Sequence, residues 1–223
     1  IIIIDHHENP DKYADIMISY SKMSSTCEMV YDFICLIDKN KINNKIATCL
    51  YTGIVADTGS FRYPSTTSKT LKTGAELINY GVNVTEIYEK LYNNLQFKRL
   101  KLLGAAINNY KKIDGLPVLY TMITDHDQKI NDFKKGDSEG FVNFGLSVTG
   151  ILCSVLFIEK KDEGLIKISF RSKGDFKVNI FASRHFNGGG HEYASGGISK
   201  LSLMETEKKF IKDIKHHIKE NYE

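Results

Sequence analysis

The sequence IIIIDHH, residues 1–7, places four β-branched apolar side chains directly before an aspartate and two histidines. Apolar residues on both faces of so short a segment are typical of a strand buried in a parallel sheet. Ligands of open α/β sheets bind beyond the carboxyl ends of such strands, where Asp5, His6 and His7 stand. The pattern favours an α/β fold with a site at these residues; a chance HH doublet in a polar loop is the simpler alternative.

Helical patterns and apolar strand patterns alternate along the rest of the chain, which also indicates an α/β fold. The residue pattern changes near residue 110 from a long helical stretch to a series of strand candidates. This change predicts a domain boundary there. The expected elements are strands at 1–4, 15–19, 115–124, 150–161 and 164–174, and helical segments at 24–37, 43–57, 65–81, 84–112, 125–146, 176–186 and from about 203. The S-x-x-E spacing of Ser25 and Glu28 predicts a capping box at the start of the first helix, and Gly59 is expected to stop the second.

Composition excludes several classes of protein. The formal net charge of +3 is spread evenly over the 223 residues, so a long duplex-binding stripe is not expected. The four cysteines form no C-x-x-C pair, which indicates reduced, buried thiols of a cytoplasmic protein rather than a zinc knuckle or disulfide framework. No apolar run approaches the roughly 20 residues of a membrane helix. Because the chain starts at Ile1, we expect its native N-terminus to be missing.

Asp57 lies in the segment GIVADTGSFRYP, at the expected end of the second helix. An imidazole such as that of His6 together with carboxylate oxygens suits a manganese-like divalent ion. Asp57 is either a metal ligand at a tight turn or simply a loop residue at the C-terminal end of the helix. The D-T-G-S sequence is also found in aspartic proteases, which need two such carboxylates and β-structure before them, so this is a remote alternative.

A second candidate site combines the strand end SFRSKG with the glycine-rich segment FNGGGHEYASGG. Consecutive glycines allow backbone amides to approach an anion, and Arg171 suits bidentate contact with phosphate. The alternative for the glycines is a flexible surface loop. Two phosphate-competent elements in one small domain favour a phosphate site, with these candidate residues: Arg171, Ser172, Lys173, Gly188, Gly189, Gly190 and His191.

The segments IIIIDHH, SST-E, LYTGIVADTGSFRYP, FRSKG and NGGGHEYASG occur in an order that closely resembles the DHH phosphoesterase superfamily. The resemblance covers essentially the whole chain and is strongest to the nanoRNase and phosphoadenosine-phosphate phosphatase branch related to RecJ. It implies the C-terminal part of a parallel-sheet DHH catalytic domain at 1–110, ending in a helical linker. A smaller α/β DHH-associated domain at 111–223 would follow, with the nucleotide held in the cleft between the domains.

The resemblance also implies roles for particular residues. His6 and Asp57 would ligate Mn²⁺, His7 would face the scissile phosphate, and Asp5 would orient the neighbouring histidine. Arg171, Ser172, Lys173 and residues 188–191 would hold the substrate. The complete enzyme would use two Mn²⁺ ions, with Mg²⁺ or Co²⁺ as alternatives, and its remaining ligands would come from an H-x-x-x-D-x-D-like segment upstream of residue 1.

The function implied is hydrolysis of short RNA or DNA oligonucleotides or linear dinucleotides to mononucleotides, and of phosphoadenosine phosphate to AMP. The sequence does not rank these substrates. The alternative from a different class is a nucleotide-binding fragment without catalysis, because the upstream ligands are not in this chain. We further expect either poor solubility or a homodimer that covers the segment at residues 1–4, since this apolar segment would otherwise lie on an open sheet edge.

Overall fold

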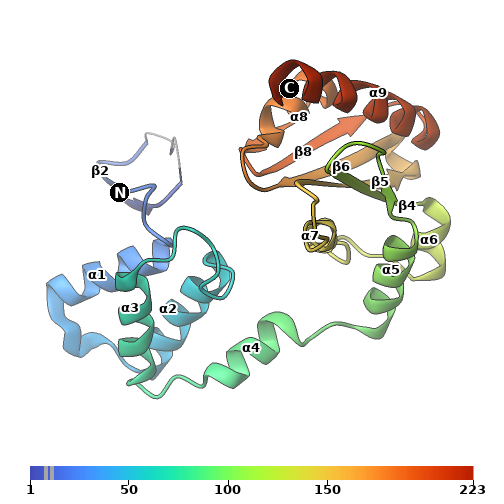
Figure 1. Cartoon of the computed structure of the whole chain (residues 1–223). Helices are drawn as coiled ribbons and strands as arrows, with labels where there is room; N and C mark the ends of the chain where they lie inside the picture. The colour runs from blue at the N-terminus through green and yellow to red at the C-terminus, as the bar shows by residue number, and fades with distance from the viewer. Residues whose placement is uncertain (8–9, 11–12, 223) are drawn as a thin grey trace. The chain divides into compact units, whose positions relative to one another are not determined.

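The computed structural model describes residues 1–7, 10 and 13–222, and its contacts divide the chain into two units, Ile1–Asn94 and Leu95–Glu223 (Figure 1). The division lies before the boundary predicted near residue 110. The reason is helix α5 (Phe97–Asn108), whose Leu102 and Leu103 are buried in a cluster with strands of the second unit.

The first unit combines a two-stranded sheet with a group of helices. Strand β1 pairs in parallel with β2, with Ile2 opposite Ile16 and Asp5 opposite Ser19, so both strands predicted here are confirmed. The elements of this unit are β1 (Ile2–Asp5), β2 (Ile16–Ser19), α1 (Thr26–Asp38), η1 (Lys39–Lys41), α2 (Asn44–Asp57), α3 (Ser68–Ile78) and α4 (Val84–Tyr92).

The side chains of this small sheet are more exposed than the sequence predicts. Ile2 is 54% exposed and Ile16 is 53% exposed, so the expectation of a strand buried on both faces is wrong for the part of the chain described. The reason is that, among these residues, β2 is the only strand paired with β1.

Helices α1, α2 and α3 enclose the apolar core of the first unit, in which Ile54, Val55 and Leu77 are fully buried. Ser25 caps α1 as predicted, because its hydroxyl accepts the Glu28 N–H. The Glu28 side chain does not complete the predicted capping box; it accepts hydrogen bonds from two hydroxyl groups elsewhere in the unit, described below.

The second unit is built on one six-stranded sheet with the order β3-β4-β5-β6-β8-β7. Only the β4–β5 pair is parallel, and the other four pairs are antiparallel. Besides α5, its elements are β3 (Lys111–Lys112), β4 (Val118–Ile123), α6 (Asp125–Ile130), α7 (Phe141–Leu146), β5 (Cys153–Lys160), η2 (Lys161–Glu163), β6 (Leu165–Ser172), α8 (Val178–Phe186), β7 (Gly189–His191), β8 (Ala194–Ser199) and α9 (Leu203–Tyr222).

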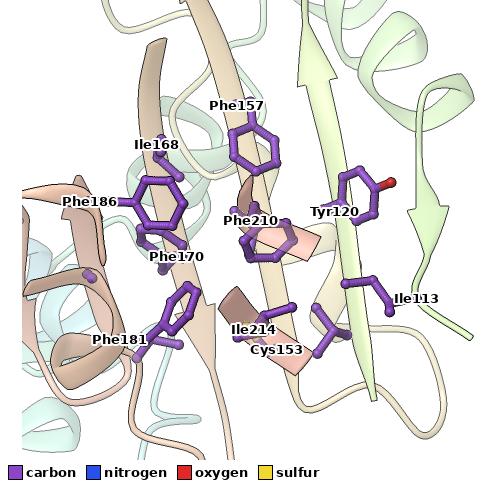
Figure 2. Close-up of a cluster of buried hydrophobic side chains, with 14 of the residues drawn as sticks. Ile113, Tyr120, Cys153, Phe157, Ile168, Phe170, Phe181, Phe186, Phe210 and Ile214 are labelled. Carbon is purple, nitrogen blue, oxygen red and sulfur yellow. The ribbon is translucent and has the colours of Figure 1, made fainter. Parts of the chain in front are cut away.

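Helices cover this sheet on both faces, which gives a three-layer α/β arrangement within the unit (Figure 1). On one face, α8 and α9 pack an aromatic cluster against the strands, including Phe157, Phe170, Phe181 and Phe210 (Figure 2). On the other face, α5 and α7 contribute to a smaller cluster with Leu156. Strand β5 is therefore buried from both sides, which explains its almost uninterrupted apolar sequence.

The glycine-rich segment contains a strand, which differs from the flexible surface loop named above as the alternative. Gly189–His191 forms the edge strand β7, and a two-residue turn joins it to β8, where His191 lies opposite Ala194. Glycine is unfavourable in strands on average, so its sequence gave no strand signal. Here the pairing depends on a close approach of backbones, because a Cβ on Gly188 would lie 2.0 Å from the Gly196 carbonyl oxygen.

All four cysteines carry free thiols, as expected, but only Cys153 is buried, and Cys49 is exposed. The expectation of four buried thiols is thus wrong. Within the described residues, no helix has both the length and the apolar character required to cross a membrane.

Candidate functional site

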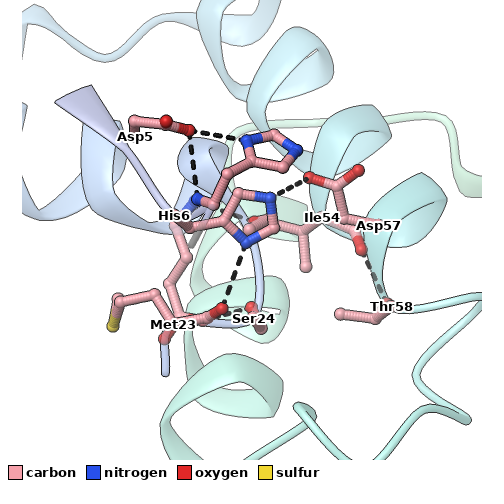
Figure 3. A network of polar contacts seen from close by, with 10 residues as sticks. Asp5, His6, Met23, Ser24, Ile54, Asp57 and Thr58 are labelled. Carbon is pink, nitrogen blue, oxygen red and sulfur yellow. Dashed lines mark hydrogen bonds and ion pairs between the residues drawn. The ribbon is translucent and has the colours of Figure 1, made fainter. Parts of the chain in front are cut away.

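The end of strand β1 brings His6 next to Asp57, at the last turn of α2 (Figure 3). The His6 Nε2 atom lies 3.7 Å from Oδ2 of Asp57. The other ring nitrogen, Nδ1, donates a hydrogen bond to the Met23 carbonyl oxygen at 3.2 Å. The two candidate metal ligands, 51 positions apart in the sequence, therefore meet at one point.

The hydrogen bond to Met23 fixes the chemical form of the His6 ring. A carbonyl oxygen can only accept, so Nδ1 carries a proton and the neutral ring has its lone pair on Nε2. That lone pair and the Asp57 carboxylate are then two acceptors directed at the same space. A divalent cation, or a proton on Nε2, satisfies both, and this donor pair fits a manganese-like ion.

Asp5 and His7 form a second pair beside the first. His7 Nδ1 donates to Oδ1 of Asp5 at 2.7 Å, and the His7 backbone N–H donates to the same atom. These bonds lower the pKa of Asp5 below its usual value, the side-chain bond being the largest cause. The Asp5 carboxylate thereby orients the ring of His7, which lies with its centroid 4.8 Å from that of His6.

A buried carboxylate, which the sequence suggested only as a helix cap, supports the segment that holds His6. Glu28 is 1% exposed, and its Oε2 accepts hydrogen bonds from the hydroxyls of Ser24 and Thr70, the latter at 3.0 Å. Ser24 directly follows Met23, so Glu28 fixes the carbonyl that orients the His6 ring. The S-x-x-E pattern indicated a role for Glu28, but the contact with Thr70 on α3 is not visible in it.

The helix that ends at Asp57 bears on one of the alternatives left open for this residue. Asp57 ends helix α2, as predicted, and Gly59 follows with a φ of +54°. An aspartic protease needs β-structure at this position, so the helix removes the protease alternative. Among the residues described, no group of three or more His, Cys, Asp or Glu side chains is arranged to hold a metal ion. In the part of the chain described, His6 and Asp57 thus meet as a pair.

In the second unit, the sheet places Arg171 and His191 on one face. Both lie opposite Ala194, Arg171 from β6 and His191 from β7, and directly paired residues of a sheet point to the same side. Arg171 is half-buried, and its Nη1 donates to the Phe170 carbonyl oxygen at 2.9 Å. The structure thus brings together two of the predicted phosphate-binding side chains.

Ser172 lies on the opposite face from Arg171, because neighbouring residues of a strand alternate. It pairs with Cys153 of the aromatic cluster's face and is 6% exposed. Its hydroxyl has no hydrogen-bond partner among the residues described. Lys173, beyond the strand, is exposed and donates to the Leu146 carbonyl oxygen at 2.7 Å. The structure therefore does not bring the Ser172 side chain to the face of Arg171.

The three consecutive glycines are under different structural constraints. Gly188 touches the backbone of Gly196, and Gly190 has a φ of +132°, which disfavours any side chain. Gly189 has neither constraint, since a Cβ there would have no atom within 4 Å. It lies opposite Gly196 and two residues from His191, on the same face as Arg171. This face consequently has a patch without side chains beside two basic residues.

Two parts of the chain match family models: residues 1–54 match the DHH family N-terminal domain, and residues 115–220 match the DHHA1 domain. The chain is 36% identical over 195 residues to a bifunctional oligoribonuclease and PAP phosphatase NrnA of Bacillus subtilis (strain 168), covering 86% of the chain and 60% of the relative. It is 31% identical over 222 residues to the protein of that name from Thermus thermophilus, covering 98% and 64%.

A solved structure, that of an exopolyphosphatase-related protein from Bacteroides fragilis, superposes with a TM-score of 0.92 at 37% identity. That comparison covers 97% of this chain and 63% of the other. The chain thus spans less than two thirds of the length of these relatives.

Proposed function

The chain belongs to the DHH phosphoesterase superfamily, with a DHH domain followed by a DHHA1 domain, and we propose that it serves in the hydrolysis of short oligonucleotides to mononucleotides. Linear dinucleotides and phosphoadenosine phosphate are the other substrates that we propose. The names of the relatives from Bacillus and Thermus, which include oligoribonuclease and PAP phosphatase, support these substrate classes.

The observation that carries the proposal is the convergence of His6 Nε2 and Asp57 Oδ2 at 3.7 Å, with the proton of the His6 ring held on the opposite nitrogen. Such a pair of acceptors suits a divalent cation, and we propose Mn²⁺, with Mg²⁺ and Co²⁺ as alternatives. A bound divalent ion would supply an activated water molecule and neutralise charge on the phosphoryl group.

Other residues of the chain would orient the two histidines or bind phosphate groups of the substrate. Met23 fixes the direction of the His6 lone pair, and Asp5 fixes the ring of His7. A histidine oriented in this way can donate a hydrogen bond to a phosphate oxygen, which is the role that we propose for His7. In the second unit, Arg171 and His191 would bind the phosphate of a nucleotide, with Gly189 leaving room for it.

The experiment measures metal binding and turnover with the purified chain. Mn²⁺ affinity is determined by calorimetry, and hydrolysis of the 5′-phosphorylated dinucleotide pApA is followed by chromatography of AMP. His6→Ala and Asp57→Asn should each weaken Mn²⁺ binding and abolish turnover. His126→Ala, which removes an exposed histidine of α6 in the second unit, is the matched control and should change neither.

Loss of Mn²⁺ binding in His126→Ala, or full turnover in His6→Ala, would contradict the proposed site. Binding of AMP by the wild-type chain without hydrolysis of any of the three substrates would favour the second candidate, a nucleotide-binding protein without catalysis. The absence of a group of three metal ligands among the described residues is the observation that favours this candidate. We also propose a cytoplasmic location and a homodimer, the latter to be tested by sedimentation velocity.

A further inference from the structure

The turn that follows Asp57 has an unusual backbone. Gly59, Ser60 and Phe61 all have left-handed conformations, with φ of +54°, +64° and +61°. A left-handed backbone is unfavourable for a residue with a side chain, so two such residues in succession persist only where their surroundings impose them. Here the Ser60 N–H donates to the Val55 carbonyl oxygen at 2.8 Å, and the Phe61 N–H donates to the Thr58 hydroxyl at 2.9 Å.

Two aromatic rings hold this turn from either side of Arg62. The Phe61 ring packs into the core of the first unit, 6.1 Å from the ring of Tyr51 and next to Gly74. The Tyr63 ring lies against Gly59, where a Cβ would come within 2.5 Å of it. Arg62 thus starts from a backbone that is fixed on both sides, within five residues of Asp57.

The guanidinium of Arg62 is itself oriented. Its Nε donates to the Gly59 carbonyl oxygen at 2.7 Å, and this is the only hydrogen bond or ion pair found for the side chain within the described part of the chain. The side chain is exposed, so its two Nη groups face solvent. An arginine fixed at Nε presents the Nη groups as a fork that fits two oxygens of a phosphate.

Arginine is rare in this protein, which contains four arginines and 26 lysines. Arg99 binds the carbonyl oxygens of Asp137 and Glu139, and Arg184 pairs with Glu220. Arg62 is the one arginine of the first unit. A lysine could equally well provide a positive charge near the negative C-terminal end of the α2 dipole. The presence of an arginine with an oriented guanidinium therefore needs another explanation.

We propose that Arg62 binds a phosphate group of the substrate whose hydrolysis depends on His6 and Asp57. The inference rests on the proposed function, and it adds a substrate-binding residue to the first unit, where the candidates so far are a metal-binding pair and His7. The phosphate is either the one that is cleaved or the terminal 5′-phosphate next to it, since both have the same recognition chemistry.

The test compares Arg62→Gln and Arg62→Lys with the wild-type chain, using ApA and pApA in the presence of Mn²⁺. Lys69→Gln is the matched control, because it removes one exposed positive charge from the same unit. Losing the fork should lower kcat/KM by about tenfold to a hundredfold in Arg62→Gln. Arg62→Lys should recover only part of it, and Lys69→Gln should remain within twofold of wild type.

Equal losses on both substrates would assign Arg62 to the cleaved phosphate, and a loss confined to pApA would assign it to the terminal one. Melting temperature and AMP affinity separate binding from a structural role: the affinity for AMP should fall in Arg62→Gln while the melting temperature stays unchanged. Values of kcat/KM and AMP affinity within twofold of wild type would overturn the proposal. If the wild-type chain hydrolyses neither dinucleotide, the proposed function fails, and the AMP affinity still tests Arg62.

Discussion

Replacing Gly188 by alanine should destabilise the second unit strongly, whereas replacing Gly189 should not. A Cβ at Gly188 would lie 2.0 Å from the Gly196 carbonyl oxygen and 2.9 Å from the Gly197 Cα. Both are backbone atoms of β8, so the strand itself must move by more than 1 Å. At Gly189 a Cβ would meet no atom within 4 Å, and its backbone has no positive φ.

The size of the effect follows from these contacts. Overpacking of a core side chain costs about 1–3 kcal/mol, and displacement of the backbone of β8, which is paired on both sides, should reach at least the upper end of that range. For a unit of this length, a loss of 1 kcal/mol lowers the melting temperature by roughly 3–5 °C. Gly188→Ala should therefore melt at least about 10 °C below wild type, and Gly189→Ala within about 2 °C of it.

Scanning calorimetry measures the unfolding transition of the second unit in both variants, and AMP affinity is measured on the same samples. Gly189→Ala should bind AMP more weakly while folding normally, because its methyl group enters the patch without side chains beside His191. If Gly188→Ala melts within 2 °C of wild type, the close approach of β7 and β8 is not a constraint on the fold. If Gly189→Ala binds AMP as wild type does, the face next to it does not contact the nucleotide.

Three further predictions concern the caps, the charges and the faces of the sheet. Ser25→Ala should lower the stability of the first unit by about 1 kcal/mol in urea unfolding, since the Glu28 N–H loses its acceptor. Burial, and to a smaller extent Arg184, lowers the pKa of His217 below its ordinary value of about 6.5, so the unfolded chain binds the proton more readily. The second unit should therefore lose stability as pH falls below about 6.5, and His217→Gln should reduce this dependence in calorimetry between pH 7.5 and 5.5. Ser172→Ala should leave AMP affinity unchanged, whereas Arg171→Gln should weaken it at least tenfold.

Local signals predicted much of the fold correctly. The Ser25 cap, the stop at Gly59 and the apolar run of β5 each depend on residues within one helix or strand, and each element is found where the sequence places it. The pairing of His6 with Asp57 was also expected, although through resemblance to a family rather than through spacing. Each of these features could be predicted because the residues that determine it lie in one short segment or in a known set of family motifs.

The features that sequence analysis missed depend on contacts between distant segments. Strand β7 exists because β8 accepts a glycine backbone at close range, and no residue of β7 has a high strand propensity. The role of Glu28 depends on Thr70, 42 positions later in the chain. Likewise, Arg171 and Ser172 point to opposite faces because side chains alternate along a strand, but only the register with β5 shows which face each of them takes.

That alternation has a consequence for how relatives of this protein can differ in length. A substitution at an exposed position of β6 changes one side chain, whereas a single residue inserted or deleted early in β6 would turn Arg171 toward the aromatic cluster and Phe170 toward the opposite face. The turn at Lys161–Glu163 lies outside this constraint, because its residues are at the end of the sheet. Homologous chains should therefore vary in length at that turn and keep the number of residues from Leu165 to Ser172 unchanged.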